Sequence, residues 1–199
     1  MQTYPTGYAE SHRMAEQIFR EILPQHGMAV REEQIALCHE VLDTLYNKEI
    51  SLCEAGVGTG KTLAYLVACI LWQMHRSDRV KLPIVVSTSS VALQDAILME
   101  YLPHLSAVLL DEGIIGTPIT AVVRKGKERF ACDARLLERQ AQINHHSQRQ
   151  LKSLRMAEHV LDLDHIPGLS RFDRSRISVP QSCPRDCSLR EDCRYLQYL

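Results

Sequence analysis

The chain has 199 residues, of which 45% are hydrophobic, 23 are Lys or Arg and 24 are Asp or Glu. This length and composition allow a sizeable buried core and exclude both a disordered chain and a small fold that depends on disulfides. The longest nearly unbroken apolar run, residues 63–72, is too short to span a bilayer. Residues 1–13 lack the pattern of a secretory signal. A cytoplasmic chain with no membrane partner is therefore expected.

The net charge of −1 hides an uneven distribution of charged side chains. Residues 1–60 carry 4 basic and 9 acidic side chains, residues 61–123 carry 4 and 5, residues 124–155 carry 9 and 3, and residues 156–199 carry 6 and 7. The net charges of these segments are therefore −5, −1, +6 and −1. The third segment is the one place where charge indicates a polyanionic partner, although a solvated helix face explains the same charges.

The spacing of apolar residues predicts alternating helices and strands in the first part of the chain. Four segments show helical spacing or a continuous apolar helix pattern: residues 10–23, 31–47, 63–74 and 89–101. Three short apolar or β-branched runs are predicted as strands: residues 50–54, 83–88 and 118–123. This order predicts an α/β fold, with a parallel sheet flanked by helices and right-handed crossovers. After about residue 125 the strand pattern stops. Residues 133–162 are predicted as polar helices, and the segment after Pro167 as a loop.

A glycine-rich loop separates the first predicted strand from the helix that follows. Residues 54–62 read EAGVGTGKT, which matches the phosphate-loop pattern with alanine in place of the first glycine. Glycines let successive backbone N–H groups face one anion, and the start of a helix adds its positive dipole end. Lys61 and Thr62 are the predicted catalytic residues. Lys61 is predicted to reach the β- and γ-phosphates of ATP, and Thr62 is predicted to ligate Mg²⁺. The predicted nucleotide-binding residues of the loop are Ala55, Gly56, Val57, Gly58, Thr59, Gly60, Lys61 and Thr62.

The segments EAGVGTGKTLAYL and IVVSTSSVALQDAIL together resemble motifs I and Ia of DinG/XPD-like superfamily 2 DNA helicases. The resemblance implies a RecA-like P-loop domain over residues 1–124. REEQ at residues 31–34 resembles the Q motif of that branch, which implies that Gln34, supported by Arg31, recognises adenine. The residues that the resemblance implies for contacts with the DNA backbone are Thr88, Ser89 and Gln94. The alternative for this last segment is an ordinary strand-to-helix turn with Ser90 or a neighbour as N-cap.

The seven cysteines of a chain expected in a reducing compartment need a role other than disulfides. Cys38, Cys53 and Cys69 lie in predicted helices and a strand, and are predicted as small core residues. The other four are Cys132, Cys183, Cys187 and Cys193. Four thiolates at this spacing suit either a [4Fe–4S] cluster or structural Zn²⁺. The resemblance implies the cluster, carried by an inserted, mainly helical domain over residues 125–199.

The basic segment KGKERFAC leads into the first of these four cysteines. It resembles the run of glycine, basic and aromatic residues that precedes the first cluster cysteine of the family. In that family the iron–sulfur domain lies over the path of the DNA, and cationic side chains beside an aromatic ring suit single-stranded DNA. The DNA contacts implied here are Lys125, Lys127, Arg129 and Phe130. Without the resemblance, the same segment would be interpreted as a solvated surface.

The motor of that family also needs an Asp–Glu pair for Mg²⁺ and a second RecA-like domain. In the family these parts follow the fourth cysteine, whereas this chain ends six residues after Cys193. The run SAVLLDEGII offers such a pair in Asp111 and Glu112. Because it precedes the cluster cysteines, it is interpreted instead as the end of a helix closed by Gly113. The chain is therefore expected to be an N-terminal fragment that binds ATP and is inactive alone.

The leading hypothesis is the ATP-binding and iron–sulfur portion of a monomeric, DinG-like DNA helicase that uses ATP, Mg²⁺ and a [4Fe–4S] cluster. The resemblance implies 5′→3′ movement and a single-stranded or forked DNA substrate. One alternative is a P-loop ATPase that remodels nucleic-acid complexes or supports a nuclease without unwinding. A second alternative is a non-catalytic, zinc-bearing DNA-binding module. Metal analysis separates the last alternative from the other two.

Overall fold

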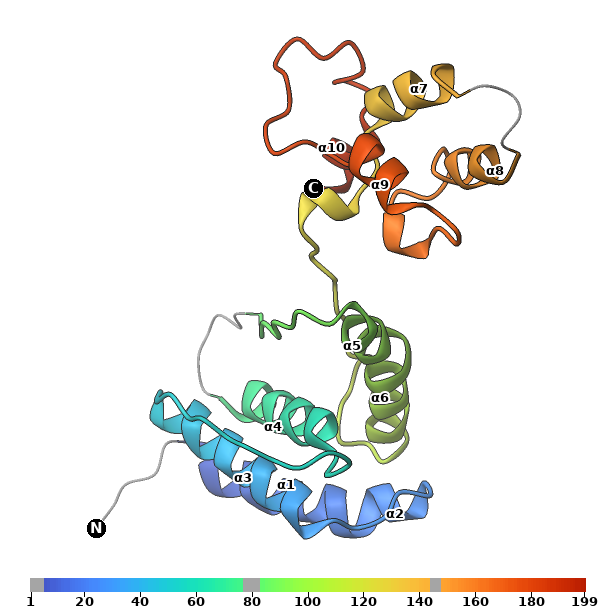
Figure 1. Ribbon diagram of the computed structural model, residues 1–199. Helices are drawn as coiled ribbons and strands as arrows, with labels where there is room; N and C mark the ends of the chain where they lie inside the picture. The colour runs from blue at the N-terminus through green and yellow to red at the C-terminus, as the bar shows by residue number, and fades with distance from the viewer. Residues whose placement is uncertain (1–5, 77–82, 144–147) are drawn as a thin grey trace. The chain divides into compact units, whose positions relative to one another are not determined.

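The chain folds into two units in a computed structural model that describes residues 6–76, 83–143 and 148–199. Unit 1 is Met1–Val123 and unit 2 is Arg124–Leu199. Figure 1 shows helices and extended segments in both units. The division falls where the strand pattern of the sequence stops. Within the described residues, no helix is both long and apolar enough to cross a membrane.

Unit 1 has helices where the apolar spacing predicts them. They are α1 (Tyr8–Gln17), a π-helical turn (Ile18–Ile22), α2 (Leu23–Gln25), α3 (Glu32–Asn47), α4 (Lys61–His75), α5 (Val91–Ala96), a second π-helical turn (Ile97–Tyr101) and α6 (Leu102–Asp111). The Ser90 side chain accepts a hydrogen bond from the Leu93 N–H at 3.2 Å, which confirms Ser90 as the N-cap of α5. Helical spacing therefore located these elements to within a few residues.

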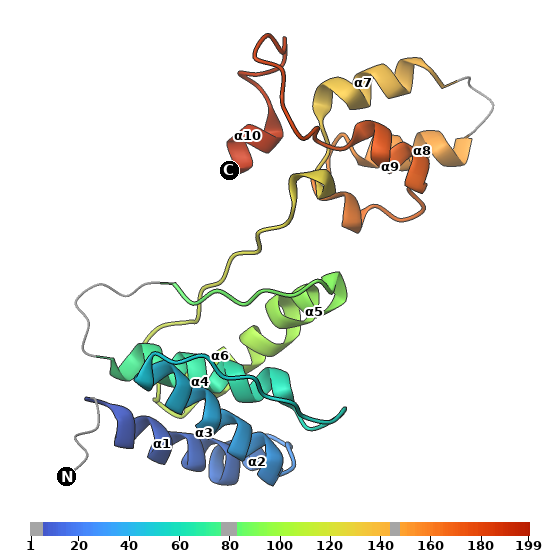
Figure 2. The same ribbon diagram turned by 60° about the vertical axis from the view of Figure 1, so that its left-hand side comes forward.

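The core of unit 1 lies between α1, α3 and α4, which run side by side in both ribbon views (Figure 1, Figure 2). Ala64, Val67 and Leu71 of α4 are fully buried there, as expected for a helix that is apolar nearly all round. Cys38 of α3 is also fully buried, and burial raises the pKa of its thiol. Burial raises the pKa of the Cys69 thiol in α4 to about 11. Cys38 is therefore a small core residue, as predicted, whereas Cys69 is half-buried.

The predicted parallel sheet is wrong for the part of the chain that the structure describes. No strand occurs in these residues, and their β pairing is limited to two isolated antiparallel bridges in unit 2. The three predicted segments form no strand there, and apolar side chains in each of them face solvent, with Ile50 100%, Val85 83% and Val122 84% exposed. A strand needs a neighbour for its N–H and C=O groups, and short apolar runs do not specify that neighbour.

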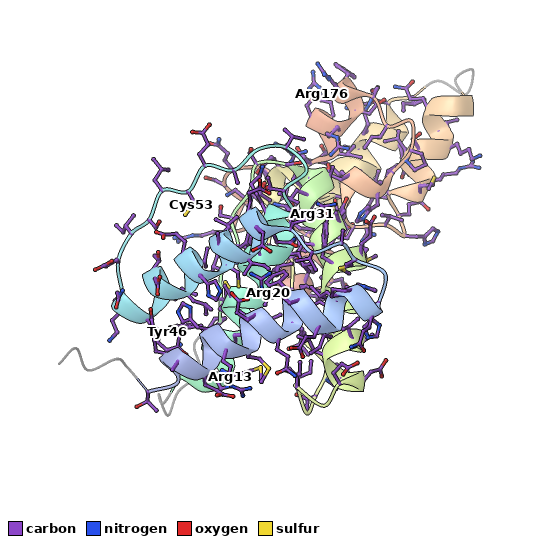
Figure 3. All side chains as sticks on the ribbon, turned by 90° about the horizontal axis from the view of Figure 1, so that it is seen from below. Arg13, Arg20, Arg31, Tyr46, Cys53 and Arg176 are labelled. Atoms are coloured by element: carbon purple, nitrogen blue, oxygen red, sulfur yellow. The ribbon has the colours of Figure 1, made fainter. Side chains whose placement is uncertain are left out.

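The loss of the first strand also corrects the prediction for Cys53. This residue lies on the extended segment before the phosphate loop and is exposed, as Figure 3 shows from below unit 1. Its Sγ atom lies 3.2 Å from the Ser51 hydroxyl. Cys53 is therefore a surface thiol and not a core residue, because no element covers the segment that carries it.

The run that contains Asp111 and Glu112 is helical, as interpreted from the sequence. Helix α6 ends at Asp111, Glu112 is its C-cap, and Gly113 follows with φ 66°. A left-handed glycine after a helix is a common C-terminal stop. The Glu112 carboxylate lies 3.5 Å from Nε2 of His26. This geometry does not present the Asp–Glu pair at the end of a strand.

Unit 2 is built from short helices around a small apolar core. Its helical segments are a 3₁₀ turn (Lys127–Arg129), α7 (Asp133–Ala141), α8 (Gln148–Met156), a second 3₁₀ turn (Leu163–His165), α9 (Arg171–Ile177) and α10 (Arg194–Tyr198). Leu136, Leu154 and Ile177 are buried in its core. The predicted polar helices over residues 133–162 correspond to α7 and α8, while residues 144–147 lie outside the described residues.

Helices α9 and α10 lie where the sequence pattern predicted a loop. Helix α9 begins after Ser170, whose side chain accepts a hydrogen bond from the Asp173 N–H at 3.0 Å. Both helices are short, and each buries few apolar side chains. Helical periodicity is therefore weak in this part of the sequence. Ser170, a residue type that favours the N-cap, was the local indication that a helix begins there.

Candidate functional site

The phosphate loop is an exposed turn in front of the longest apolar helix of unit 1. Gly58 and Gly60 have φ angles of 84° and 82°, a backbone conformation that side chains with a Cβ rarely adopt. Gly60 is the N-cap of α4 and supplies no side-chain cap, so the first N–H groups of the helix are open to an anion. Lys61 and Thr62 occupy the first turn. This arrangement matches what the loop sequence predicts for phosphate binding.

The Lys61 ammonium lies against the loop itself. Its Nζ atom donates to the carbonyl oxygens of Ala55 and Gly56, each at 2.7 Å. The Thr59 hydroxyl donates to the same Gly56 oxygen at 3.0 Å, which closes the loop from the other end. The lysine is exposed, so its ammonium can turn towards an incoming phosphate by rotation of its side chain alone.

Arg31 and Gln34 both reach the phosphate loop from the start of α3. The Gln34 side-chain amide donates to the Gly60 carbonyl oxygen at 2.8 Å, and an Arg31 Nη atom donates to the Gly58 carbonyl oxygen. Gln34 is buried, whereas Arg31 is exposed and is labelled in Figure 3. The structure thus brings two segments of the predicted nucleotide site together. In this arrangement they hold the loop backbone, and adenine recognition stays a prediction.

The contact between Gln34 and Gly60 leads to the first prediction. Gly60→Ala would place a Cβ about 2.1 Å from Nε2 of Gln34 and would force alanine to a φ of 82°. The left-handed conformation costs roughly 1–2 kcal/mol, and the clash displaces Gln34 from the loop. We expect Gly60→Ala to weaken ATP–Mg²⁺ binding at least about tenfold in isothermal titration calorimetry.

Gly113→Ala is the matched control for this change. Gly113 also has a positive φ, 66°, but a Cβ there would meet nothing within 4 Å. It lies at the end of α6, away from the loop in sequence. We expect this variant to lose stability without losing nucleotide affinity. Equal losses of affinity in the two variants would contradict a specific role for the Gln34 contact.

The polar residues predicted to touch the DNA backbone lie at the start of α5. The Thr88 hydroxyl accepts a hydrogen bond from the Ser90 N–H at 3.1 Å, and the Gln94 side-chain amide donates to the Thr88 carbonyl oxygen at 3.3 Å. Ser89 is exposed. The structure brings these side chains together around one helix start, where they stabilise the turn. Their contact with DNA stays a prediction.

The four predicted cluster cysteines all lie in unit 2 as free thiols. Cys132 is the N-cap of α7 and Cys193 the N-cap of α10. Burial raises the pKa of Cys132, the nearby Cys183 adds to this effect, and the backbone N–H groups of residues 134 and 135 oppose it. Four free thiols are the donor type that binds a [4Fe–4S] cluster or Zn²⁺. Among the described residues, however, no three His, Cys, Asp or Glu side chains are placed together to hold one.

Residues next to two of these cysteines are joined directly. The Arg194 Nε atom donates to an Asp133 carboxylate oxygen at 2.8 Å, and the Arg194 backbone N–H donates to the other oxygen at 3.2 Å. Further Arg194 nitrogens donate to the carbonyl oxygens of Ala157 and Glu158 at 2.8 and 2.7 Å. This network fixes the starts of α7 and α10 relative to each other. It therefore brings the backbones of Cys132 and Cys193 into one neighbourhood, although the Arg194–Asp133 pair itself was not predicted from the sequence.

The basic segment predicted to bind DNA is largely engaged inside unit 2. The Lys125 side chain is 4% exposed and its Nζ atom lies 2.7 Å from Asp162 and 3.5 Å from Asp164. Arg129 pairs with Asp164 at 3.2 Å, and Lys127 donates to the Gln181 carbonyl oxygen. Burial alone would raise the pKa of the Asp164 carboxyl, but hydrogen bonds from Arg174 and Arg129 outweigh it and lower that pKa.

The ring of Phe130 is also enclosed. It is 4% exposed and lies 5.5 Å from the Tyr195 ring and 4.9 Å from the Tyr198 ring, measured between centroids. In this arrangement the ring supports the packing of α10 and does not present a free face to a base. The acidic residues that neutralise the basic segment lie more than 30 positions away in sequence, so the charge pattern alone did not reveal them.

Comparison with known proteins gives partial similarity over this same chain. The chain is similar to proteins named 3'-5' exonuclease DinG. It is 32% identical over 117 residues to the protein of that name from Bacillus subtilis (strain 168), and 29% identical over 92 residues to that from Staphylococcus aureus (strain USA300). These matches cover 59% and 46% of the chain.

The chain spans about a tenth of the length of these curated relatives, 11% and 10% respectively. No protein-family model matches the chain, and no solved structure matches it. The similarity supports a DinG-like relationship for about half of the chain. It agrees with the family resemblance carried by the phosphate loop and the segment after it.

Proposed function

We propose that this chain is the ATP–Mg²⁺-binding and single-stranded-DNA-binding portion of a DinG-like nucleic-acid enzyme that acts as an ATP-dependent DNA helicase. One observation carries the proposal: Arg31 and Gln34 converge on a glycine loop that leads into the N-terminus of α4. A glycine turn unrelated to nucleotide binding would not be expected to contact both Arg31 and Gln34 of the segment that resembles the Q motif. The similarity to proteins named DinG supports the coarser part of the proposal, a DinG-like nucleic-acid enzyme.

In this proposal each loop residue has a separate task. Backbone N–H groups of the loop and of the first turn of α4 surround the β-phosphate, and Lys61 exchanges its two carbonyl contacts for phosphate oxygens. The Thr62 hydroxyl, in the first turn of α4, would ligate Mg²⁺. Bound Mg²⁺ supplies neutralisation of charge on the β- and γ-phosphates. Hydrolysis and strand separation are proposed for the whole protein, and binding for these residues.

The proposal includes a [4Fe–4S] cluster in unit 2, held by Cys132, Cys183, Cys187 and Cys193. Their thiols are uncommitted to disulfides, and the Arg194–Asp133 network supports two of their backbones. Such a cluster would join the C-terminal loop to the start of α7 through four bonds between iron and cysteine sulfur. Because the thiols are not gathered in the described arrangement, ligation would require the loop that carries Cys183 and Cys187 to close.

Metal and nucleotide analysis of the same sample tests both parts of the proposal. The chain is purified without oxygen, and its iron, acid-labile sulfide and zinc are measured beside ATP–Mg²⁺ binding by calorimetry. We expect about four irons and four sulfides per chain, as the cluster composition requires, and saturable ATP binding at one site. A colourless, stoichiometrically zinc-bound chain would replace the cluster by a zinc module, and a chain that binds no ATP would refute the nucleotide site.

A second candidate follows from the name of the relatives, which are called exonucleases and not helicases. On this hypothesis the same nucleotide site belongs to a P-loop ATPase that supports a nuclease without unwinding. Strand separation by the whole protein distinguishes the two. Unwinding of a forked duplex that depends on ATP supports the helicase, whereas ATP-stimulated cleavage without unwinding supports the nuclease partner.

A further inference from the structure

A different surface of unit 2 presents an aromatic ring between two cations. Phe172 of α9 is 55% exposed, and the guanidinium carbons of Arg139 and Arg176 lie 5.1 and 5.3 Å from its ring centroid. We call these three residues the Phe172 patch. Arg176 projects from the ribbon of unit 2 in Figure 3. A large exposed aromatic ring beside arginines is typical of a recognition surface. The Phe172 ring is not part of the apolar core of unit 2.

The patch rests on a rigid buried contact between α7 and α9. Asp173, the neighbour of Phe172, is 1% exposed and accepts hydrogen bonds from Arg139 at 2.8 Å and from the Ser170 hydroxyl at 2.6 Å. Burial alone would raise the pKa of Asp173, but these hydrogen bonds outweigh it and lower that pKa. Asp173 is buried, whereas Phe172, one position earlier in the same helix, lies on the exposed side of α9.

The charge of the patch is positive. The buried Asp173 carboxylate offsets Arg139, whereas Arg176 makes no ion pair or hydrogen bond to the residues that the structure describes. Arg176 is exposed and its guanidinium lies beside the Phe172 ring, where a phosphate can reach it. The basic segment that the sequence indicated is different, since Lys125 and Phe130 are each 4% exposed. Unit 2 therefore presents an accessible combination of ring and cation on α9, besides Arg124 over the Tyr198 ring, which is 42% exposed.

We propose that the Phe172 patch binds single-stranded DNA, with an unpaired base stacked at the Phe172 ring and a neighbouring phosphate paired with Arg176. The inference rests on the proposed binding of DNA and assigns that binding a specific place. Every base has a flat π face, so stacking on an aromatic ring tolerates any sequence. A guanidinium that already lies beside the ring can pair with the backbone phosphate without a large movement of its side chain.

The test compares a normal oligonucleotide with one that lacks bases. Fluorescence anisotropy measures the affinity of the 199-residue chain for oligothymidylate and for an abasic strand of equal length. We expect Phe172→Leu to weaken oligothymidylate binding about tenfold and abasic binding less than twofold, because leucine keeps apolar bulk but lacks a π face. Phe172→Tyr should restore the affinity. Arg176→Gln should weaken both strands and lower the salt slope by roughly 0.7.

Two matched controls separate the patch from general surface effects. Leu137→Ala removes another exposed apolar side chain of unit 2, which is 57% exposed, and Arg155→Gln removes an exposed arginine from α8. Neither variant should change the ratio of the affinities for oligothymidylate and for the abasic strand. Unchanged oligothymidylate affinity in Phe172→Leu overturns the patch alone, while a wild-type chain that binds neither strand overturns the proposed DNA binding as well. Equal weakening of polyglutamate binding would assign the patch to acidic polypeptides and overturn base stacking.

Discussion

Lys61→Ala is expected to weaken the binding of ATP–Mg²⁺ about 100-fold. The Lys61 ammonium lies in the first turn of α4, with its Nζ atom 2.7 Å from two loop carbonyl oxygens. Charge-assisted hydrogen bonds to phosphate contribute roughly 1.5–3 kcal/mol, and alanine removes them together with the opposite charge. Isothermal titration calorimetry of the purified chain at constant Mg²⁺ measures the effect directly.

Two variants make this prediction specific. Lys48→Ala removes an exposed lysine at the C-cap of α3 and should leave ATP affinity within about twofold of wild type, since exposed substitutions away from a site have small effects. Lys61→Arg keeps the charge but replaces a compact ammonium with a broad planar fork, so partial recovery is expected. Wild-type affinity in Lys61→Ala would contradict the assignment of the phosphate site.

The helices of unit 1 could be predicted from the sequence because their causes are local. Apolar spacing located α3 and α4, Ser90 capped α5, and Gly113 closed α6. Each of these features depends on residues within about one turn of one another. The positive φ angles of the phosphate loop likewise follow from glycines at fixed positions.

The predicted sheet failed because strand pairing is a non-local property. The run at residues 50–54 has the apolar composition of a buried strand, yet Leu52 is fully exposed in an extended segment without a partner. Composition predicts that such a run avoids water, but it does not specify which backbone would pair with it. The glycine-rich motif therefore predicted the position of the loop, but the strand that normally precedes such a motif is absent from the described residues.

The candidate site shows the same division between local and distant causes. The phosphate loop was recognisable from consecutive residues, whereas the contacts of Arg31 and Gln34 with it join positions 26 and 27 apart. In unit 2, Asp162 and Asp164 neutralise a basic segment that appeared free, and Arg194 reaches Asp133 across 61 positions. Ion pairs of this kind depend on the packing of α7, α9 and α10, which the polar sequence of unit 2 left unspecified.

Arg194→Ala is expected to lower the free energy of unfolding of unit 2 by about 2–3 kcal/mol. The substitution removes hydrogen bonds to Asp133, Ala157 and Glu158 and leaves the partly buried Asp133 carboxylate without its cation. Amide exchange of Ala131 and Cys132, whose N–H groups donate to carbonyls within unit 2, reports this loss. The fluorescence of Trp72, which lies in α4 of unit 1, should report an unchanged transition for that unit.

The same variant connects stability to the proposed cluster, because Arg194 and Asp133 directly follow two of the four cysteines. If the network pre-positions Cys193 and Cys132, iron and sulfide content should fall by about half or more in Arg194→Ala, and Asp133→Asn should fall between it and wild type. Arg190→Ala removes an exposed arginine from the same C-terminal segment and should retain both stability and iron. A full complement of iron in a destabilised Arg194→Ala chain would limit the network to folding, whereas loss of both would establish that the ion pair holds the ligand backbones in register for the metal.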